Sequence, residues 1–307
     1  MFRFEREQKV YDIGGVKVGG QPGEYPIVLV GSIFYEKHKI MSDPDKGEFD
    51  KAKAEALIKK MEELSDKTGN PFFLDVVGRT SEALIREIDF VADNTKAPFL
   101  IDGASEKLRI PATKHAFEIG LKDRTIYNSI DYAIQPSEIQ AMKELGVKSS
   151  IVLAFNKKNP WPEGAIETLK GTSERKGLLS LAEEAGIENI LVDTAVADIV
   201  TIGLAAKAIN LVKSEYGFPA GCGPANAYTT WKRGKKGEFG PYAYNVVVGS
   251  AGPFIQLMGA NFILFGPVEL AEAAFPACAM ADALIAYAAK KVGTKVGTRN
   301  HPLYKIL

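Results

Sequence analysis

Short apolar runs alternate along the chain with segments whose apolar residues recur at helical spacing. Helical spacing is clear at Leu84, Ile88 and Val91, which share one face of a helix. Strands buried on both faces read as nearly continuous apolar runs, and strands that alternate with helices predict a parallel sheet. Eight such runs begin at Ile27, Phe72, Pro98, Thr125, Ser149, Asn189, Phe218 and Asn261.

Eight strand and helix units predict an α/β protein with a single TIM (β/α)8 barrel over residues 1–307. The doubly wound alternative needs a glycine-rich phosphate loop after the first strand, and GSIFYEKHK is not one. Residues 1–26 contain GGVKVGGQPGEYP, which predicts a β-hairpin and turn that cover the barrel. Left-handed helix caps are expected at four glycines that lead into strands, Gly120, Gly146, Gly186 and Gly217.

Composition excludes several classes of partner and chemistry. The 38 basic residues balance 38 acidic ones without a polybasic block, which argues against nucleic acid or an anionic membrane as partner. Two Cys and three His without metal-ligand spacing predict neither a disulfide framework nor a bound metal. The charged N-terminus is unlike a signal peptide and no run is long enough to span a membrane, so we expect a cytoplasmic protein without membrane insertion.

Polar residues follow the predicted strands at their C-terminal ends, where a TIM barrel builds its active site. Each of them alone fits equally well as a cap of the next helix. The three carboxylates among them, however, lie inside apolar runs. A buried carboxylate without a partner costs several kcal/mol of folding free energy. Together they predict a ligand pocket rich in hydrogen-bond acceptors, formed by Asp75, Asp102, Asn128, Asn156, Asp193 and Asn226.

A reduced pterin fits such a pocket, because its 2-amino group and ring N–H groups can donate two parallel hydrogen bonds to one carboxylate. Glycines near the last two strands, Gly221 among them, would let the ring approach the backbone closely. Lys157 and Lys158 follow the fifth strand and leave a barrel aldolase or lyase as the alternative enzyme class. His38 lies between lysines and is predicted to be a surface residue.

Seven stretches spread along nearly the whole chain carry a family resemblance. They are DIGGVKVGGQPGEYP from Asp12, FYEKHKI from Phe34, DKTGNPF from Asp66, FLID from Phe99, IYNSI from Ile126, SIVLAFN from Ser150 and LVDTAV from Leu191. In them the chain resembles the family of the H subunit of tetrahydromethanopterin S-methyltransferase, which includes bacterial relatives that act on tetrahydrofolate. The resemblance implies methyl transfer between a corrinoid and N5 of a tetrahydropterin.

The strand ends also resemble, more distantly, the methyltetrahydrofolate:corrinoid methyltransferases, which are pterin-binding barrels. The matching stretches are LDVVG, LIDGA, YNSI, LVDT and GCGPAN. This resemblance implies that Asp102, Asn128 and Asp193 hold the pterin, while Asn226 contacts N5. A proton at N5 is then stabilised by that amide or by a water held by Asp193 or Asp75.

The resemblances also imply the partners. None of the three histidines has the Asp-x-His-x-x-Gly setting of a cobalamin domain, so we expect a corrinoid protein to supply methylcobalamin. The loop around Tyr228, Trp231 and Arg233 is a candidate docking surface, and a solvated charged loop is the favoured alternative for it. The apolar helix expected over 270–289 predicts a homodimer. Tetrahydrofolate is the first choice of pterin. The alternatives are tetrahydromethanopterin, with the chain as the H subunit of a larger membrane-associated complex, and a non-catalytic pterin-binding subunit.

Overall fold

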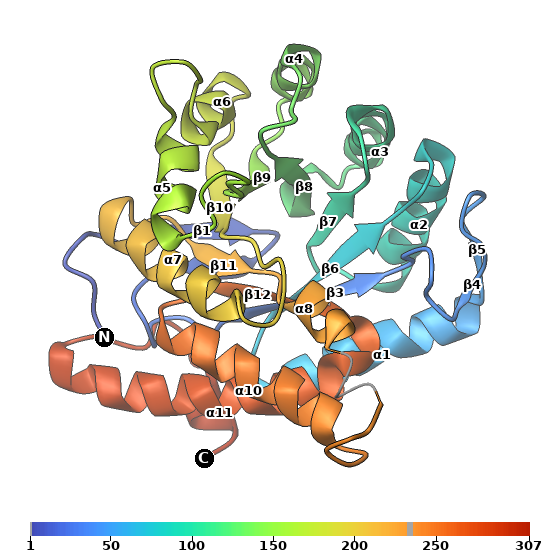
Figure 1. The fold of residues 1–307 in the computed structure, drawn as a ribbon. Helices are drawn as coiled ribbons and strands as arrows, with labels where there is room; N and C mark the ends of the chain where they lie inside the picture. The colour runs from blue at the N-terminus through green and yellow to red at the C-terminus, as the bar shows by residue number, and fades with distance from the viewer. Residues whose placement is uncertain (1, 232–235) are drawn as a thin grey trace.

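A closed barrel of eight parallel strands forms the centre of the computed structural model, which describes residues 2–231 and 236–307 apart from the side chains of Asn226 and Thr229 (Figure 1). Each strand lies within one of the predicted apolar runs, and the last strand pairs with the first. The predicted TIM barrel is therefore confirmed. Its strands are β3 (Val28–Ile33), β6 (Phe72–Val77), β7 (Phe99–Asp102), β8 (Thr125–Ile130), β9 (Ser149–Leu153), β10 (Asn189–Asp193), β11 (Ala220–Cys222) and β12 (Phe262–Pro267).

Helices cover the outer face of the barrel (Figure 1). The four predicted glycine caps all have φ in the left-handed region, between 68° and 83°. The helices are α1 (Lys51–Thr68), α2 (Ser81–Asn94), α3 (Glu106–Glu118), α4 (Pro136–Leu145), α5 (Pro162–Lys170), α6 (Leu178–Glu184), α7 (Ile202–Glu215), α8 (Ala225–Thr230), α10 (Ala243–Leu257), α11 (Ala271–Ala289) and α12 (Pro302–Lys305), with 3-10 turns η1 (Lys122–Arg124), η2 (Val268–Leu270) and η3 (Lys290–Val292).

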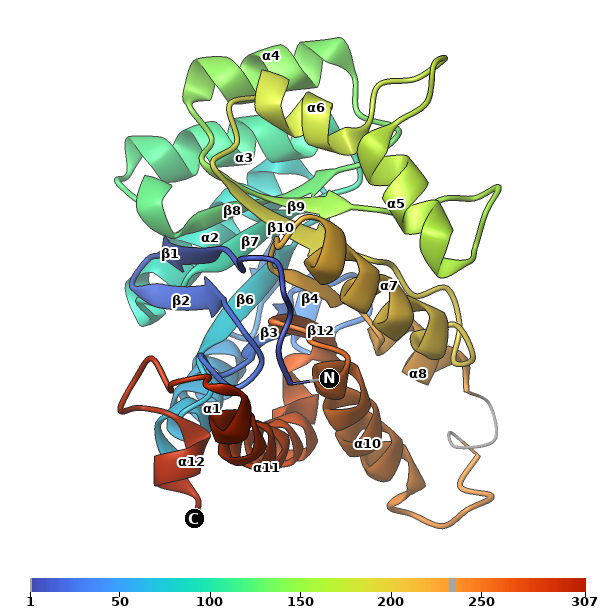
Figure 2. The same ribbon diagram turned by 90° about the vertical axis from the view of Figure 1, so that its left-hand side faces the viewer.

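The N-terminal hairpin is confirmed and closes one end of the barrel. Its strands, β1 (Val10–Ile13) and β2 (Val16–Gly19), are antiparallel and contribute Ile13 and Val18 to the apolar cluster inside the barrel. Figure 2 shows the hairpin lying across the barrel. Gly14 of the hairpin packs so closely that a Cβ there would contact Pro98 and Arg124, which directly precede β7 and β8. The hairpin therefore covers the end at which the strands begin, and the opposite end stays open for a ligand.

A second, shorter hairpin follows the first barrel strand and was not predicted. Its strands, β4 (Met41–Asp43) and β5 (Glu48–Phe49), are too short to give a periodic signal. Phe49 packs against Phe34 at a ring separation of 4.4 Å and against Phe90 of α2 at 5.0 Å. This packing fixes the loop that leaves β3 beside the open end of the barrel. Within the described residues, no helix combines the length and the apolar content that crossing a membrane requires.

Candidate active site

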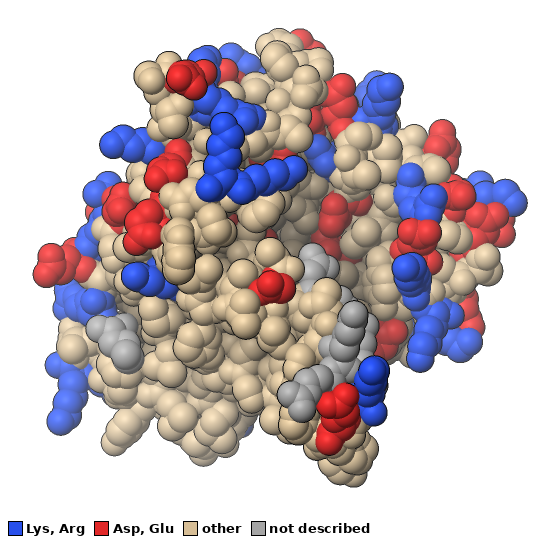
Figure 3. Space-filling view, viewed as in Figure 1, with Lys and Arg blue, Asp and Glu red and all other residues tan. Residues whose placement is uncertain are grey.

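A cavity of about 720 Å³ opens at the C-terminal ends of the barrel strands, where the molecular surface is hollowed (Figure 3). Four of the predicted residues line it together, namely Asp75, Asp102, Asn128 and Asp193. Strand register explains part of this arrangement, because Asp102 of β7 lies directly beside Asn128 of β8. The described lining contains three carboxylates and no Lys, Arg, His or Cys. The cavity therefore offers a ligand hydrogen-bond acceptors and uncharged hydrogen-bond donors.

Asp75 is held in place by neutral donors. The Ser32 hydroxyl donates to its Oδ2 at 2.8 Å, and Asn128 Nδ2 lies 3.4 Å from its Oδ1. Ser32 is the register partner of Asp75 on the neighbouring strand, so the pairing of β3 with β6 sets this contact. Burial raises the pKa of Asp75, and the two hydrogen bonds lower it only in part. Ser32 was not among the predicted residues, because a serine inside a strand gives no signal without its partner.

Asp102 is the carboxylate most strongly shifted toward its protonated form. Burial raises its pKa, the charge of nearby Asp75 raises it further, and Arg109 opposes both effects. Arg109 Nη1 donates to the Gly103 carbonyl at 2.6 Å, and its Nη2 lies 2.5 Å from Glu138 Oε1. Arg109 thereby fixes the turn that carries Asp102. Sequence analysis missed Arg109, although its position on the buried face of α3, three residues before Ala112, is a usable signal.

Asp193 lies at the start of an unusual loop. Its Oδ1 accepts the Ala195 N–H at 2.7 Å, and Ala195 has a φ of 56°, which is rare for a residue with a side chain. Burial raises the pKa of Asp193 to about 6. The carboxyl group therefore changes protonation state close to neutral pH. The loop after it, through Ala197, forms one wall of the cavity.

The glycine that faces Asp193 is Gly223, which lines the cavity. A Cβ at Gly223 would lie 4.0 Å from Asp193 Oδ2. Gly221 is not among the lining residues. Its carbonyl accepts the Thr194 N–H at 3.0 Å, and a Cβ there would come within 2.1 Å of the Phe262 carbonyl oxygen. Gly221 is thus required for the close packing of β11 on β12, and its predicted contact with a pterin has no support in this geometry.

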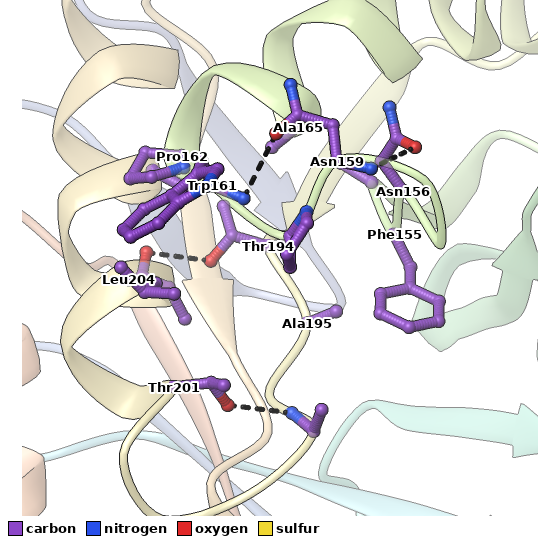
Figure 4. Close-up of a pocket in the computed structure, with 15 residues that line it drawn as sticks. Phe155, Asn156, Asn159, Trp161, Pro162, Ala165, Thr194, Ala195, Thr201 and Leu204 are labelled. Carbon is purple, nitrogen blue, oxygen red and sulfur yellow. Dashed lines mark hydrogen bonds between the residues drawn. The ribbon is translucent and has the colours of Figure 1, made fainter.

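Asn156 holds the loop after β9 in place and caps no helix, because α5 begins at Pro162 with Trp161 as its N-cap. Its Oδ1 accepts the N–H groups of Lys158 and Asn159 at 3.0 and 3.1 Å, and it does not line the main cavity. Figure 4 shows its side chain pointing away from the ring of Phe155. The same loop and α7 enclose a pocket of about 50 Å³, which is too small for a pterin ring (Figure 4).

The region predicted to meet a corrinoid protein is only partly described. Asn226 lies in the first turn of α8, and its side chain is outside the described part of the structure, as is the whole of Arg233. Tyr228 is 1 % exposed, so its predicted role in a docking surface is wrong. It faces the interior because α8 packs against β12. Trp231 is partly exposed and stacks on Phe239 at 5.8 Å.

His38 is buried, so its prediction as a surface residue is wrong. Its Nδ1 accepts the Phe34 N–H at 3.1 Å, which leaves Nε2 to donate to Glu269 at 2.9 Å. The ring of Tyr35, which lines the cavity, stacks on the imidazole at 4.6 Å. His38 therefore links the loop after β3 to η2 and supports Tyr35 from behind. Its flanking lysines misled the sequence argument, because only the fold brings Glu269 to it.

Lys157 and Lys158 are exposed and lie outside the main cavity. A lysine that forms a Schiff base must reach the bound substrate, so this geometry does not support the aldolase alternative. Among the residues that the structure describes, no group of three His, Cys, Asp or Glu side chains is arranged to hold a metal ion.

The chain matches a known protein family over nearly its whole length. Residues 6–297 match the family model described as tetrahydromethanopterin S-methyltransferase MtrH subunit. The chain is 46% identical over 313 residues to the H subunit of tetrahydromethanopterin S-methyltransferase from Methanothermobacter marburgensis, and 42% identical over 322 residues to that from Methanocaldococcus jannaschii. Each comparison covers 100% of both chains.

Solved structures with the same fold include two dihydropteroate synthases. The enzyme from Xanthomonas albilineans, in complex with 7,8-dihydropteroate, has a TM-score of 0.59 at 16% identity, over 90% of this chain and 98% of that one. The enzyme from Yersinia pestis has a TM-score of 0.60 at 11% identity, with the same coverage. At these identities the likeness concerns the barrel fold alone.

Proposed function

Because the chain belongs to the family of the H subunit of tetrahydromethanopterin S-methyltransferase, a family of methyltransferase subunits, we propose that it transfers a methyl group between N5 of a tetrahydropterin and a corrinoid. The curated relatives are named for tetrahydromethanopterin, so we now place this pterin ahead of tetrahydrofolate. The observation that carries the proposal is the group of three carboxylates that line one cavity, with Asn128, at the open end of the barrel.

In this proposal the carboxylates have separate tasks. Asp75 already accepts hydrogen bonds from Ser32 and Asn128, so it orients the Asn128 amide. Asp102 makes no side-chain hydrogen bond among the described residues, and its oxygens are available to the 2-amino and ring N–H groups of a pterin. Ligand donors would stabilise the charged form of Asp102 and replace part of the solvation that burial removes.

We assign two chemical contributions to the chain. It aligns the pterin with the corrinoid, and it holds a proton near N5. Holding two reactants in line can supply on the order of 7 to 11 kcal/mol of the barrier reduction. When the methyl group leaves N5, that nitrogen must gain positive character. Asp193, with a pKa of about 6, is suited to hold the proton near N5 through a water, because it exchanges protons near neutral pH. Asn226 is assigned to N5 from the family resemblance.

We also propose two protein partners. A corrinoid protein brings the methyl group, and a second copy of this chain binds the face over α10 and α11. An uncharged face over α10 and α11 supports the second copy (Figure 3). Val246 and Leu284 are each 61 % exposed there, and Tyr287 is 69 % exposed. An apolar face of this kind is typical of a protein interface. The expected cytoplasmic location remains part of the proposal.

Calorimetric titration with tetrahydromethanopterin and with tetrahydrofolate tests the pterin site. Asp102→Asn sets an amide donor against the donors of the ligand, so we expect affinity to fall by roughly 30- to 150-fold, the equivalent of about 2 to 3 kcal/mol. Asp123→Asn, at an exposed carboxylate on the other end of the barrel, is the matched control and should bind normally. Unchanged affinity of Asp102→Asn would reject this pocket.

Single-turnover transfer from methylcobalamin to the bound pterin then tests the chemistry. We expect the wild-type chain to form the N5-methyl pterin, and Asp193→Asn to do so more slowly. Tight pterin binding without any transfer, in the presence of the corrinoid partner as well, would favour the alternative of a non-catalytic subunit.

A further inference from the structure

A second cavity, of about 620 Å³, adjoins the first at the mouth of the barrel. Leu153 and Phe155 line both cavities, so the two share a wall. The second cavity lies between the loop after β8, the loop after β9 and the loop that joins α5 to α6. We call it the lysine groove, after the residues that distinguish it from the main cavity, Lys157, Lys158 and Arg175.

The basic side chains of the lysine groove are not neutralised by carboxylates. Neither Lys157 nor Lys158 makes an ion pair among the described residues. The Arg175 guanidinium lies 3.7 Å from the centre of the Tyr132 ring and donates to the Tyr132 carbonyl. Figure 3 shows Lys and Arg side chains gathered over α5 and α6, above the hollow.

Two of the three acidic residues in the groove are already engaged. Glu167 accepts from Asn156 Nδ2 at 3.3 Å through one oxygen and from Asn159 Nδ2 at 3.0 Å through the other. Asp131 Oδ1 accepts the Ala133 N–H at 2.6 Å. The third, Glu174, is exposed. The groove is lined by three basic and three acidic side chains, whereas every charged side chain that lines the main cavity is acidic. Hydrogen bonds hold Glu167 and Asp131 in place, while the exposed Lys157 and Lys158 ammonium groups are unpaired among the described residues and are available to an anion.

We propose that the lysine groove binds the anionic tail of the pterin substrate, which rests on the function proposed above. A ring seated among the carboxylates needs an exit for its substituent, and the shared wall provides it. Tetrahydromethanopterin and tetrahydrofolate both carry an aryl group next to the pterin and acidic groups farther along. Phe155, 39 % exposed, presents an aromatic surface to the aryl group, and the lysines attract the acidic end.

Two ligands separate the groove from the pterin pocket. One is tetrahydromethanopterin with its complete tail, and the other is 6-methyltetrahydropterin, which has the same ring without the tail. The test variant is Lys157→Gln/Lys158→Gln. Lys290→Gln/Lys291→Gln removes the same charge from an adjacent exposed pair in η3, outside both cavities, and is the matched control. Dissociation constants are measured by calorimetry at low and at high salt.

We expect the test variant to bind the complete ligand about tenfold more weakly at low salt, because two charge-assisted contacts are lost. High salt should weaken the wild type and reduce this difference, since the charges are solvent-exposed. The test variant should bind 6-methyltetrahydropterin like the wild type, and the control variant should bind both ligands normally.

Equal affinity of the wild type and the test variant for the complete ligand at low salt would overturn the proposal while the pterin pocket stands. A loss of similar size in the control variant would also overturn it, because the effect would then come from net charge. If the wild type fails to bind 6-methyltetrahydropterin and the complete ligand alike, the proposed function itself is wrong and the groove proposal falls with it.

Discussion

Three carboxyl groups line the cavity at the mouth of the barrel without a cation among its lining residues, and their protonation follows from this. Asp75 and Asp193 are buried, and Asp102 is partly buried. Burial disfavours the charged form, so the pKa values of Asp75, Asp102 and Asp193 are all raised. In the free protein these residues cost stability at neutral pH. A ligand that donates hydrogen bonds would relieve that cost, and the desolvation of these carboxylates would thereby contribute to the proposed affinity for a pterin.

Asp193→Asn should separate stability from function. The folded-state pKa of Asp193, about 6, exceeds its ordinary value of 3.8, so its contribution to stability is complete below pH 3.8 and is lost as the pH rises through 6. The variant removes this loss and can keep the bond to Ala195 through its amide oxygen. We expect it to be more stable than the wild type at pH 8 by about 3 kcal/mol, by urea denaturation. A less stable variant at pH 8 would show that Asp193 is not destabilising.

Asn226→Ala tests the role assigned to that residue by family resemblance. A contact made mainly in the transition state changes the rate and leaves the ground-state complex intact. We expect pterin affinity within a few fold of the wild type and methyl transfer slower by about 100-fold. The N-cap of α8 is Pro224, so a large fall in melting temperature is not expected. Normal single-turnover transfer by a folded variant would leave Asn226 without a catalytic role.

At the scale of elements, α2 is packed tightly behind the strands that carry Asp75 and Asp102. A Cβ at Gly78, which follows β6, would lie 2.4 Å from Leu84 Cγ. The Gly78 N–H donates to the Asp102 carbonyl at 3.1 Å, so this turn also fixes the end of β7. The same helix buries Glu87, whose two carboxyl oxygens have no hydrogen-bond partner among the described residues. Burial raises the pKa of Glu87 to about 8.

Glu87→Gln should flatten the pH dependence of stability. The folded-state pKa of Glu87 is above its ordinary value of 4.5. The contribution of Glu87 to the free energy of unfolding is therefore fully present below pH 4.5 and is lost as the pH rises through about 8. Between pH 5 and pH 8.5 we expect the wild type to lose about 3 kcal/mol more than the variant, by denaturant unfolding at both pH values. Equal losses in the two proteins would mean that Glu87 is ionised in the folded state.

At the scale of the whole molecule, charge and apolar surface are distributed unevenly around the barrel. The mouth combines an acidic main cavity with the lysine groove, whereas the face over α10 and α11 is largely uncharged (Figure 3). The two helices pack against each other and leave Val246, Phe254, Leu284 and Tyr287 exposed. Substrate and second copy would therefore use different faces.

The proposed dimer can be broken without touching the pocket. Leu284→Glu places a charge on the exposed side of α11, so we expect a monomer by light scattering at micromolar concentration, with pterin affinity retained. Ile119→Glu changes a residue that is also exposed, by 44 %, on another side of the barrel, and should leave the dimer intact. A monomeric wild type would refute the homodimer.

The local pattern of apolar runs and glycines in the sequence was sufficient to predict the barrel. The apolar runs placed β3 and β6 to β12, and the glycines that end helices carried the left-handed geometry expected of them, because both signals depend on neighbours in the chain. The position of Asp75, Asp102, Asn128 and Asp193 at strand ends was enough to bring them into one cavity, since the strands of a TIM barrel all end at the same face.

Contacts between distant segments decided the rest. Asn156 and Asp193 look alike as strand-end residues, but the loop after β9 turns so that Asn156 accepts the N–H groups of Lys158 and Asn159 in the same loop. His38 is buried only because Glu269, far along the chain, accepts its N–H, and Arg109 reaches Glu138 only when α3 and α4 pack together. Sequence by itself thus determined the scaffold and most of the acceptor pocket. The tertiary structure alone decided which polar residues face the ligand and which are satisfied by the protein, because hydrogen-bond partners and burial are properties of the folded chain.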